Sequence, residues 1–310
     1  MSPTLPDQAL DDLLAAFPGH AGLIVKDLAD DRTYAHDVDR RFPIASVFKV
    51  PIMVELFRQV EAGIRRLDDR YQVHDELCRH GTRRDDCPVG STWSLGDLCE
   101  RMIAESNNVA TDLILEVIGL ESANQTMDAL GFANTRVCMP IGRWHYMMVG
   151  LDTAPINAEN DAIANERIRA GSIDFTALPF TDSLSNNVTS ARDMADMLEQ
   201  IYGGRLLGPT SSRQMLAMLH RCGHRRMIPC HVDPTVPIAH KIGQSARIRA
   251  DVGIVELPQR PVVVAALTTA VELGKARPGC ELIANVVKHV VAALYPEALA
   301  DASRRRPSAS

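Results

Sequence analysis

Three short motifs of this 310-residue chain hold residue types that can support nucleophilic catalysis. The first runs Ser46-Val-Phe-Lys49, and Pro43 ahead of it favours extended chain, so a helix is predicted to begin near Ser46. An i, i+3 spacing then places Ser46 and Lys49 on one helix face. A serine hydroxyl is a weak nucleophile, and a neighbouring amine can activate it by accepting its proton. The alternative is a helix-capping Ser46 with a surface Lys49.

The second and third motifs add polar groups that can assist such a serine. Ser106-Asn-Asn108 lies between two predicted helices, where Ser106 could relay a proton and Asn108 could hydrogen-bond a lysine or a substrate amide. His240-Lys241-Ile-Gly243 precedes a predicted strand. Here Lys241 would supply a cation for a carboxylate, and Gly243 would let a substrate backbone approach closely. Taken alone, each motif is equally compatible with an ordinary helix junction or strand edge.

The hydrophobic pattern predicts strands near both ends of the chain and helices between them. Residues 22–28 and 33–36 fit one β-hairpin, and residues 252–257 and 261–267 fit a second. Helical periodicity is found in these segments: 8–17, 46–60, 94–103, 109–117, 122–130, 190–201, 211–219 and 281–294. This order favours an α+β fold, in which an antiparallel sheet of terminal strands is flanked by helices and an all-α lobe is inserted.

The same pattern divides the chain into two lobes. Residues 1–45 and 205–300 are assigned to the α/β sheet lobe, residues 46–204 to the helical lobe, and residues 301–310 to a disordered tail. Residues 139–187 have the least regular pattern and are expected to form a long functional loop. A cleft where the lobes meet would hold the three motifs.

The overall composition narrows the class of protein. Lys and Arg number 33 against 39 Asp and Glu, a net charge of −6, which argues against a nucleic-acid partner. No apolar stretch approaches the roughly 20 residues of a membrane helix, and the N-terminus lacks a basic and apolar leader. Seven cysteines favour reduced thiols over a disulfide framework. We therefore expect a cytoplasmic enzyme without a membrane partner, and the composition leaves its oligomeric state open.

The order and separation of the three motifs resemble the serine β-lactamase and penicillin-binding-protein superfamily, which carries Ser-x-x-Lys, Ser-Asp-Asn and Lys-Thr-Gly elements. The class A β-lactamase branch is the most similar. The likeness runs from about residue 22 to residue 294 and rests on these segments: 43–50, 93–99, 108–113, 187–195, 240–243 and 251–255. It implies a serine hydrolase that acts on a small-molecule amide, lactam or ester and needs no cofactor.

The resemblance also implies catalytic roles for the matching residues. Ser46 would be the acylated nucleophile, Lys49 its general base or proton shuttle, and Ser106 the proton relay to the leaving group. Lys241 would support the electrostatics of Lys49 and Ser106. Asn108 would be an orienting donor.

Further residues near the third motif are candidates for substrate binding. The resemblance places the oxyanion hole between backbone N–H groups of Ser46 and of Gln244 or Ser245. Arg247 and Arg249 could bind an anionic substrate group, although a solvated strand edge is equally compatible. The expected substrate-binding residues are Asn108, Gly243, Gln244, Ser245, Arg247 and Arg249.

Three departures from the family pattern bear on the reaction. Ile242 replaces the Thr or Ser whose hydroxyl would hold a substrate carboxylate, and Asn107 replaces Asp. The deacylating Glu, with its Glu-x-x-Leu-Asn context, is not found at the family's interval. Glu166, Asp182 and Lys49 are the candidates for its task. Without that base a penicilloyl-type ester would hydrolyse slowly, so we do not expect an efficient resistance enzyme.

Two further hypotheses of function stay open. A long-lived acyl-enzyme can pass its acyl group to an amine, which would make the protein an acyltransferase or an amide-forming biosynthetic enzyme. A non-catalytic ligand-binding relative would also keep the scaffold. Binding alone does not require a Ser–Lys pair, so the presence of both residues argues against this last hypothesis.

Other chemistry-bearing residues give weaker signals. Trp144, His145 and Tyr146 are expected either to line a pocket or to pack it. No metal site is expected, because the spacing of cysteines and histidines matches no zinc motif. The residues considered for it are His74, Cys78, His80, Cys87, His220, Cys222, His224, Cys230 and His231.

Overall fold

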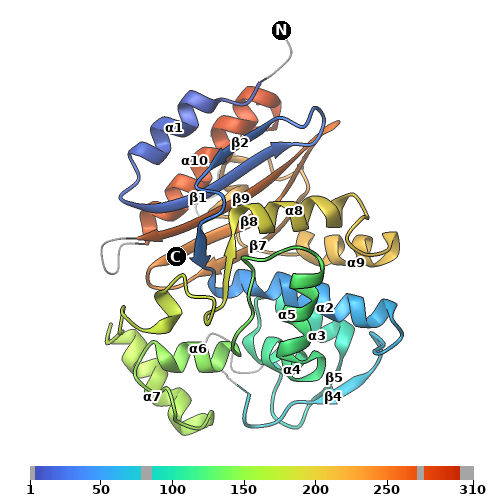
Figure 1. The fold of residues 1–310 in the computed structure, drawn as a ribbon, viewed down its shortest axis with the longest axis vertical. Coiled ribbons are helices and arrows are strands. Elements are labelled where there is room, and N and C mark those ends of the chain that lie inside the picture. The colour runs from blue at the N-terminus through green and yellow to red at the C-terminus, as the bar shows by residue number, and fades with distance from the viewer. Residues whose placement is uncertain (1–3, 78–85, 271–275, 301–310) are drawn as a thin grey trace.

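The computed structural model describes residues 4–77, 86–270 and 276–300 (Figure 1). Its central feature is a five-stranded antiparallel sheet with the order β2-β1-β9-β8-β7. The strand bounds are β1 Gly19–Asp27, β2 Thr33–His36, β7 Ile238–Gln244, β8 Ile248–Leu257 and β9 Arg260–Ala270. Both hairpins expected from the sequence, β1–β2 and β8–β9, are confirmed.

Strands β1 and β9 join the two ends of the chain. They pair along the whole of β1, from Gly19 opposite Ala270 to Asp27 opposite Val262. Because β1 and β9 are far apart in the sequence and pair over this length, the chain between them must leave the sheet and return to it as an insertion. The predicted α+β fold, with a sheet built from both ends of the chain, is therefore confirmed.

Two hydrophobic clusters cover the two faces of the sheet. Leu23 and Val25 of β1 share one cluster with α1 (Asp7–Ala15) and α10 (Arg277–Leu294). Ile24, between them, belongs to the other cluster, as the alternation of side chains along a strand requires. In Figure 1, α1 and α10 lie together on the upper side of the sheet, and the helical lobe lies below it.

Most helices of the inserted region follow the predicted periodicity. Ser94 and Ser190 cap α3 and α8 by accepting hydrogen bonds from the backbone N–H groups of Asp97 and Asp193. Ser211 lies inside α9 instead of capping it, because this helix begins two residues earlier, at Pro209. The bounds are α2 Lys49–Glu61, α3 Leu95–Ala104, α4 Asn108–Ile118, α5 Leu120–Ala129, α8 Ala191–Tyr202 and α9 Pro209–His220.

The expectation of an irregular loop over residues 139–187 is wrong. The segment contains α6 (Ile141–Met147) and α7 (Ala158–Arg169), followed by a 3₁₀ turn over Leu178–Phe180. Helix α6 is only seven residues long, and α7 is polar, with Asp161 and Ala164 as its buried residues. A short helix and a polar helix leave little apolar periodicity in the sequence, which explains the error.

Two short strand pairs complete the fold. Strands β3 (Arg41–Pro43) and β6 (Val188–Ser190) pair beside the entrance to α2, and β4 (Arg70–Gln72) pairs with β5 (Thr92–Ser94). Helix α8, which the sequence assigns to the helical lobe, packs against β1, β8 and β9. The division into lobes at residue 204 stays a prediction, and the predicted tail lies outside the described residues.

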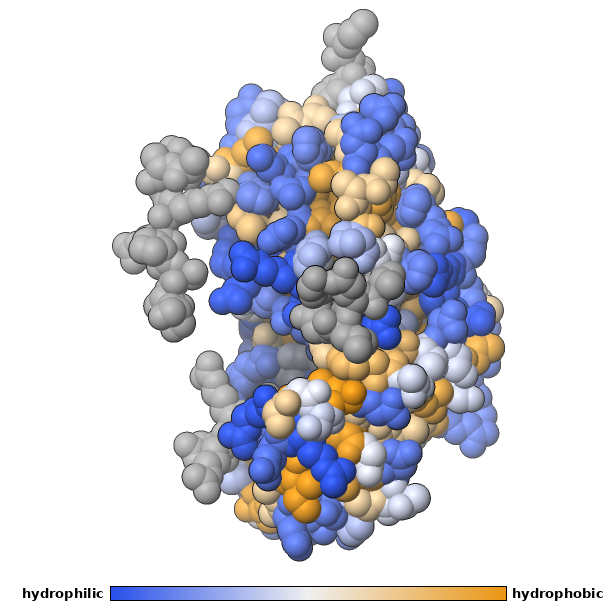
Figure 2. Space-filling model, turned by 90° about the vertical axis from the view of Figure 1, so that its left-hand side faces the viewer, coloured by the Kyte–Doolittle hydropathy of each residue, from blue (hydrophilic) through white to orange (hydrophobic). Residues whose placement is uncertain are grey.

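Among the described residues, every helix is too short or too polar to span a bilayer. On the face drawn in Figure 2, hydrophilic residues surround small patches of apolar ones.

Strand β7 meets the turn that carries Ser46 at Gly243. The turn is a short 3₁₀ helix, Ala45–Phe48, which leads directly into α2. A Cβ atom at Gly243 would overlap the carbonyl oxygen of Ile44 and press on the side chain of Val47. Glycine therefore lets the sheet approach the turn this closely, so the structure places the protein's own backbone against Gly243.

We predict that Gly243→Ala lowers the free energy of unfolding by about 3 kcal/mol, because the added methyl group forces the backbone of β7 away from the turn. Urea denaturation measures the change. Gly223→Ala is the matched control, since a Cβ atom there would meet nothing within 4 Å. Equal stability of the two variants would contradict the prediction.

Candidate active site

The three motifs converge on one pocket of about 250 Å³. Ser46 contributes from the 3₁₀ turn, Ser106 and Asn108 from the junction of α3 and α4, and Gln244 from the end of β7. The full lining comprises Ala45, Ser46, Glu105, Ser106, Asn108, Ile141, Trp144, His145, Ile242 and Gln244. Segments separated by up to about two thirds of the chain thus meet at Ser46.

Lys49 is fully buried and holds the second motif in place. Its Nζ donates to the carbonyl oxygen of Ser106 at 2.7 Å, to Ser106 Oγ at 3.1 Å and to Asn108 Oδ1 at 2.8 Å. These acceptors compensate the amine for the water it loses on burial. The alternative of a surface lysine at position 49 is therefore wrong.

Lys241 approaches the same hydroxyl from β7. Its Nζ donates to Ser106 Oγ at 3.0 Å and to the carbonyl oxygen of Ile242 at 3.1 Å. Burial lowers the pKa of the Lys241 amine, and the charges of Cys222 and Asp251 oppose this effect. Ser106 Oγ therefore lies between two amines, where a proton can pass through it.

Two residues of the pocket have left-handed backbone angles. Ala45, just before Ser46, has φ of 43°, and Ser106 has φ of 56°. Such angles are uncommon for residues with a side chain and persist only where the surrounding structure enforces them. The enforcing contacts are the strand β7 against the turn and the Lys49 bond to the Ser106 carbonyl. Both residues belong to the lining of the Ser46 pocket.

Asn107, which differs from the family's Asp, has a structural task. Its side chain accepts a hydrogen bond from the backbone N–H of Ala110 at 2.9 Å and caps α4. Asp and Asn are equally good at this position. The departure at Asn107 therefore leaves the geometry of Ser106 and Asn108 intact.

Asp112 is a residue of the site that the sequence did not single out. It is buried in α4, and its two carboxylate oxygens accept hydrogen bonds from the backbone N–H groups of Ile141 at 2.7 Å and Gly142 at 3.0 Å. Burial raises the pKa of Asp112 to about 7, although both backbone hydrogen bonds and Lys49 act against it. Asp112 thereby fixes the first turn of α6, and with it the pocket wall formed by Ile141, Trp144 and His145. The available signal was an acid directly beside the apolar run Leu113–Leu115 of α4.

The comparisons with known proteins agree with this geometry. A family model described as "Beta-lactamase enzyme family" matches residues 5–294. The chain belongs to the β-lactamase enzyme family. Beta-lactamase L2 of Stenotrophomonas maltophilia is 35% identical over 107 residues, which is 34% of each chain, so this match spans about a third of that relative.

Solved structures share the fold of this chain. A β-lactamase from Sphaerobacter thermophilus DSM 20745 has a TM-score of 0.70 at 23% identity and covers 93% of this chain and 95% of its own. The structure of PBP-A has a TM-score of 0.73 at 24% identity, with 94% and 97% covered. The chain thus combines membership of the β-lactamase enzyme family with the fold of these solved structures.

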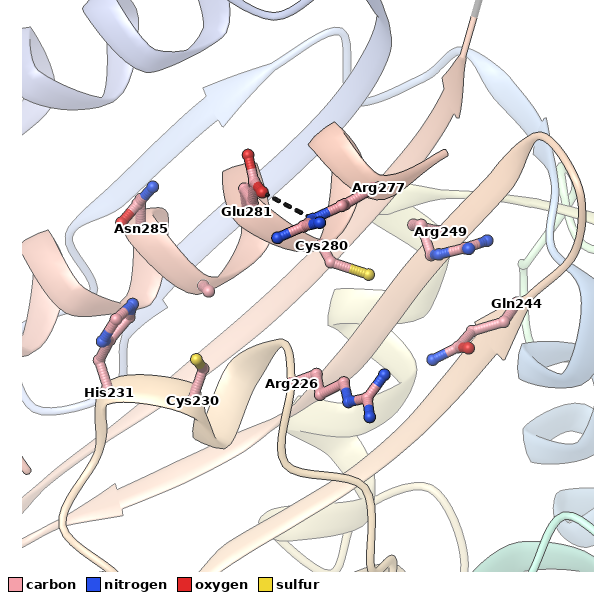
Figure 3. A pocket seen from close by; sticks show the side chains of 10 residues that line it. Arg226, Cys230, His231, Gln244, Arg249, Arg277, Cys280, Glu281 and Asn285 are labelled. Carbon is pink, nitrogen blue, oxygen red and sulfur yellow. Dashed lines mark hydrogen bonds and ion pairs between the residues drawn. The ribbon is translucent and has the colours of Figure 1, made fainter. Parts of the chain in front are cut away.

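The two candidate arginines of this β-lactamase-family protein line different cavities. Arg249 lies opposite Gln244 in the β7–β8 pairing and lines a cavity of about 600 Å³ with Arg226 and Arg277 (Figure 3). Gln244 lines both this cavity and the pocket of Ser46, so the two spaces meet there. Arg247 instead lies over the ring of Phe175, with 5.8 Å between Cζ and the ring centroid, and lines another cavity.

The remaining candidates lie apart from the pocket. Glu166 is exposed on α7, and Asp182 lines the cavity of Arg247. Ser245 Oγ lies 3.8 Å from the sulfur of Met148, beside but not in the lining of the Ser46 pocket. Of the three residues for which lining and packing were both open, Trp144 and His145 belong to the pocket lining, and Tyr146 is buried.

The described residues contain no group of three that could hold a metal ion. Cys78 and His80, two of the residues considered from the sequence, lie outside the described residues.

We predict that Asp112 makes stability fall as the pH rises from about 4 to about 7. Its pKa is about 7 in the fold and about 3.9 in an unfolded chain, so between these values the folded protein holds a proton that the unfolded chain has released. Across this window the free energy of unfolding of the native chain should fall by roughly 4 kcal/mol relative to that of Asp112→Asn, which cannot ionise. Urea denaturation of both proteins at the two ends of the window measures this. If the two proteins differ in stability by the same amount at both ends of the window, the pKa of Asp112 is not raised and the prediction is wrong.

Proposed function

We propose that this chain opens a small-molecule amide, lactam or ester through an acyl intermediate on Ser46. The observation that supports it most is the position of Ser106 Oγ between the amines of Lys49 and Lys241, in the pocket that Ser46 lines. A ligand-binding protein has no need of two buried amines on one hydroxyl, because each must be stripped of water. Catalysis by proton transfer does need them.

Acylation follows from the arrangement of these groups. Lys49, when neutral, takes the proton of Ser46 while Oγ attacks the substrate carbonyl carbon. Two amines that share Ser106 Oγ repel each other when both are charged, which favours one fewer proton on the pair. When the carbon–nitrogen or carbon–oxygen bond breaks, Ser106 gives its proton to the leaving atom and regains one from a lysine. Backbone N–H groups of Ser46 and Gln244 are the proposed oxyanion donors.

Release of the acyl group needs a base, and His145 is the group we propose for it. Glu166 and Asp182 lie outside the pocket lining, whereas His145 and the exposed Glu105 are within it. Ile141 gives the same wall an apolar surface, so the pocket offers no buried carboxylate from α6. We therefore propose slow deacylation and a poor resistance enzyme.

The cavity beyond Gln244 suggests the class of substrate. Ile242 supplies no hydroxyl for a substrate carboxylate, but Arg249 carries a guanidinium group a short way along the hairpin. Arg226 and Arg277 add positive charge to the same cavity, where Glu281 pairs with Arg277 at 3.2 Å. Guanidinium groups bind carboxylate in two-point contacts. We propose that the substrate carries an anionic group on the side of Gln244.

Acyl transfer to an amine is the second candidate function. The observation that favours it is the apolar wall at Ile141, because an ester that water attacks slowly can wait for an amine. Product analysis in the presence of added amines separates the two: only hydrolysed product would dismiss acyl transfer.

We predict that penicillin G forms an adduct with the native chain and none with Ser46→Ala, as measured by intact mass. A PBP-A mutant has been solved as an acyl-enzyme complex with penicillin G, which makes this the first probe to use. Ser172→Ala, at an exposed position after α7, is the matched control and should acylate normally. An adduct of equal yield on Ser46→Ala would refute the proposed nucleophile.

We predict that His145→Gln slows loss of the acyl group by about 10²- to 10⁴-fold, the range expected for a lost general base. Adduct formation should remain, which also shows that the variant folds. Time courses of adduct mass after removal of free penicillin measure the rate. Glu166→Gln and Asp182→Asn should match the native rate, and a normal rate in His145→Gln would reject its role.

A further inference from the structure

We propose that Cys222, together with the buried pair His240 and Asp251, forms a nucleophilic cysteine centre on the side of β7 away from Ser46. Successive residues of a strand face opposite sides, so His240 points away from the pocket that Lys241 enters. The centre would react with a small electrophile such as a peroxide. The chemistry is independent of the proposed hydrolysis at Ser46.

The imidazole of His240 is held in one orientation. Its Nδ1 lies 2.8 Å from Asp251 Oδ1, and the second carboxylate oxygen accepts a hydrogen bond from the backbone N–H of Ile228 at 2.9 Å. His240 is 1% exposed and Asp251 is fully buried. Asp251 thus fixes which ring nitrogen faces the carboxylate, as an orienting acid does in other nucleophile–histidine–acid arrangements.

The other ring nitrogen, Nε2, is buried and has no hydrogen-bond partner among the described residues. The thiol of Cys222 lies close enough to His240 for each group to shift the pKa of the other. A buried ring nitrogen that lacks any other partner leaves the thiol as the group it can serve.

The charges around Cys222 favour its ionised form. Burial alone would raise the pKa of the thiol, but the hydrogen bond and charge of His240, with the charge of Lys241 and the backbone of His224, lower it. Burial opposes a charge on His240 as well, yet Asp251 and Cys222 raise the pKa of its ring to about 10. Both shifts favour the form of the pair in which the thiol is ionised and the imidazole is protonated.

The residue that carries the thiol is only partly buried. Cys222 is half-buried and directly follows α9 and Arg221. The next residue, Gly223, is exposed, and a Cβ atom there would meet nothing within 4 Å. Space beside the sulfur is needed for attack on a peroxide, in which sulfur bonds one oxygen, the O–O bond breaks and hydroxide leaves. The sulfur of the thiolate is oxidised to a sulfenic acid, and the peroxide is reduced to the hydroxide that leaves.

Alkylation by iodoacetamide tests the proposal, with each cysteine followed by peptide mass spectrometry. In the native chain at pH 7, Cys222 should react about tenfold faster than Cys230 and Cys280, two half-buried free thiols. Asp251→Asn, which keeps the shape of the side chain, and His240→Gln should both abolish this advantage. Urea denaturation of each variant checks that it folds.

The pH profile supplies a second measurement on the native chain alone. The rate at Cys222 should stay high below the usual thiol range, because His240, Lys241, Asp251 and His224 surround it. Treatment with hydrogen peroxide should then add one oxygen at Cys222 first. A native rate at Cys222 no faster than at Cys230 and Cys280, or a rate unchanged in folded His240→Gln, would overturn the proposal.

Discussion

Two buried lysine amines that share one hydroxyl connect the two halves of this molecule. Lys49 and Lys241 are both fully buried, and each donates to Ser106 Oγ. A buried amine without partners costs several kcal/mol, so the elements that supply its acceptors cannot shift independently. Lys49 joins α2 to the junction of α3 and α4, and Lys241 joins β7 to the same junction. The close contact of Gly243 with the turn before Ser46 reinforces this connection from the sheet.

The sequence predicted those parts of the fold and the site that depend on residues close together in the chain. Ser46 and Lys49 are one turn apart, and the β8–β9 hairpin follows from β-branched residues around a short turn. Asp112 could not be found in this way, because its partners are backbone N–H groups at Ile141 and Gly142, which no residue type marks. Arg247 and Arg249 line different cavities because β8 begins between them, at Ile248. The residue types do not reveal where this strand begins.

Helix α6 shows how one buried acid shapes the chemistry of the pocket. Asp112 binds the first two amides of α6, so the helix can present only one side to Ser46. That side carries Ile141, Trp144 and His145, an apolar wall with one imidazole. A carboxylate base in this wall would have to be buried close to Asp112, and like charges in a dry site oppose each other's ionisation. An imidazole avoids that conflict, which is a physical reason for the absence of a glutamate here.

Strand β7 couples the pocket to the opposite side of the sheet through charge. Lys241 faces the pocket and His240 faces away, yet Asp251 on β8 raises the pKa of both. Cys222 acts in the same direction on Lys241, although burial dominates and lowers the pKa of that amine. The ionised thiol proposed at Cys222 would therefore favour the charged form of Lys241. Because Lys241 donates to Ser106 Oγ, the charge in the proposed active site depends in part on groups on the opposite side of the strand.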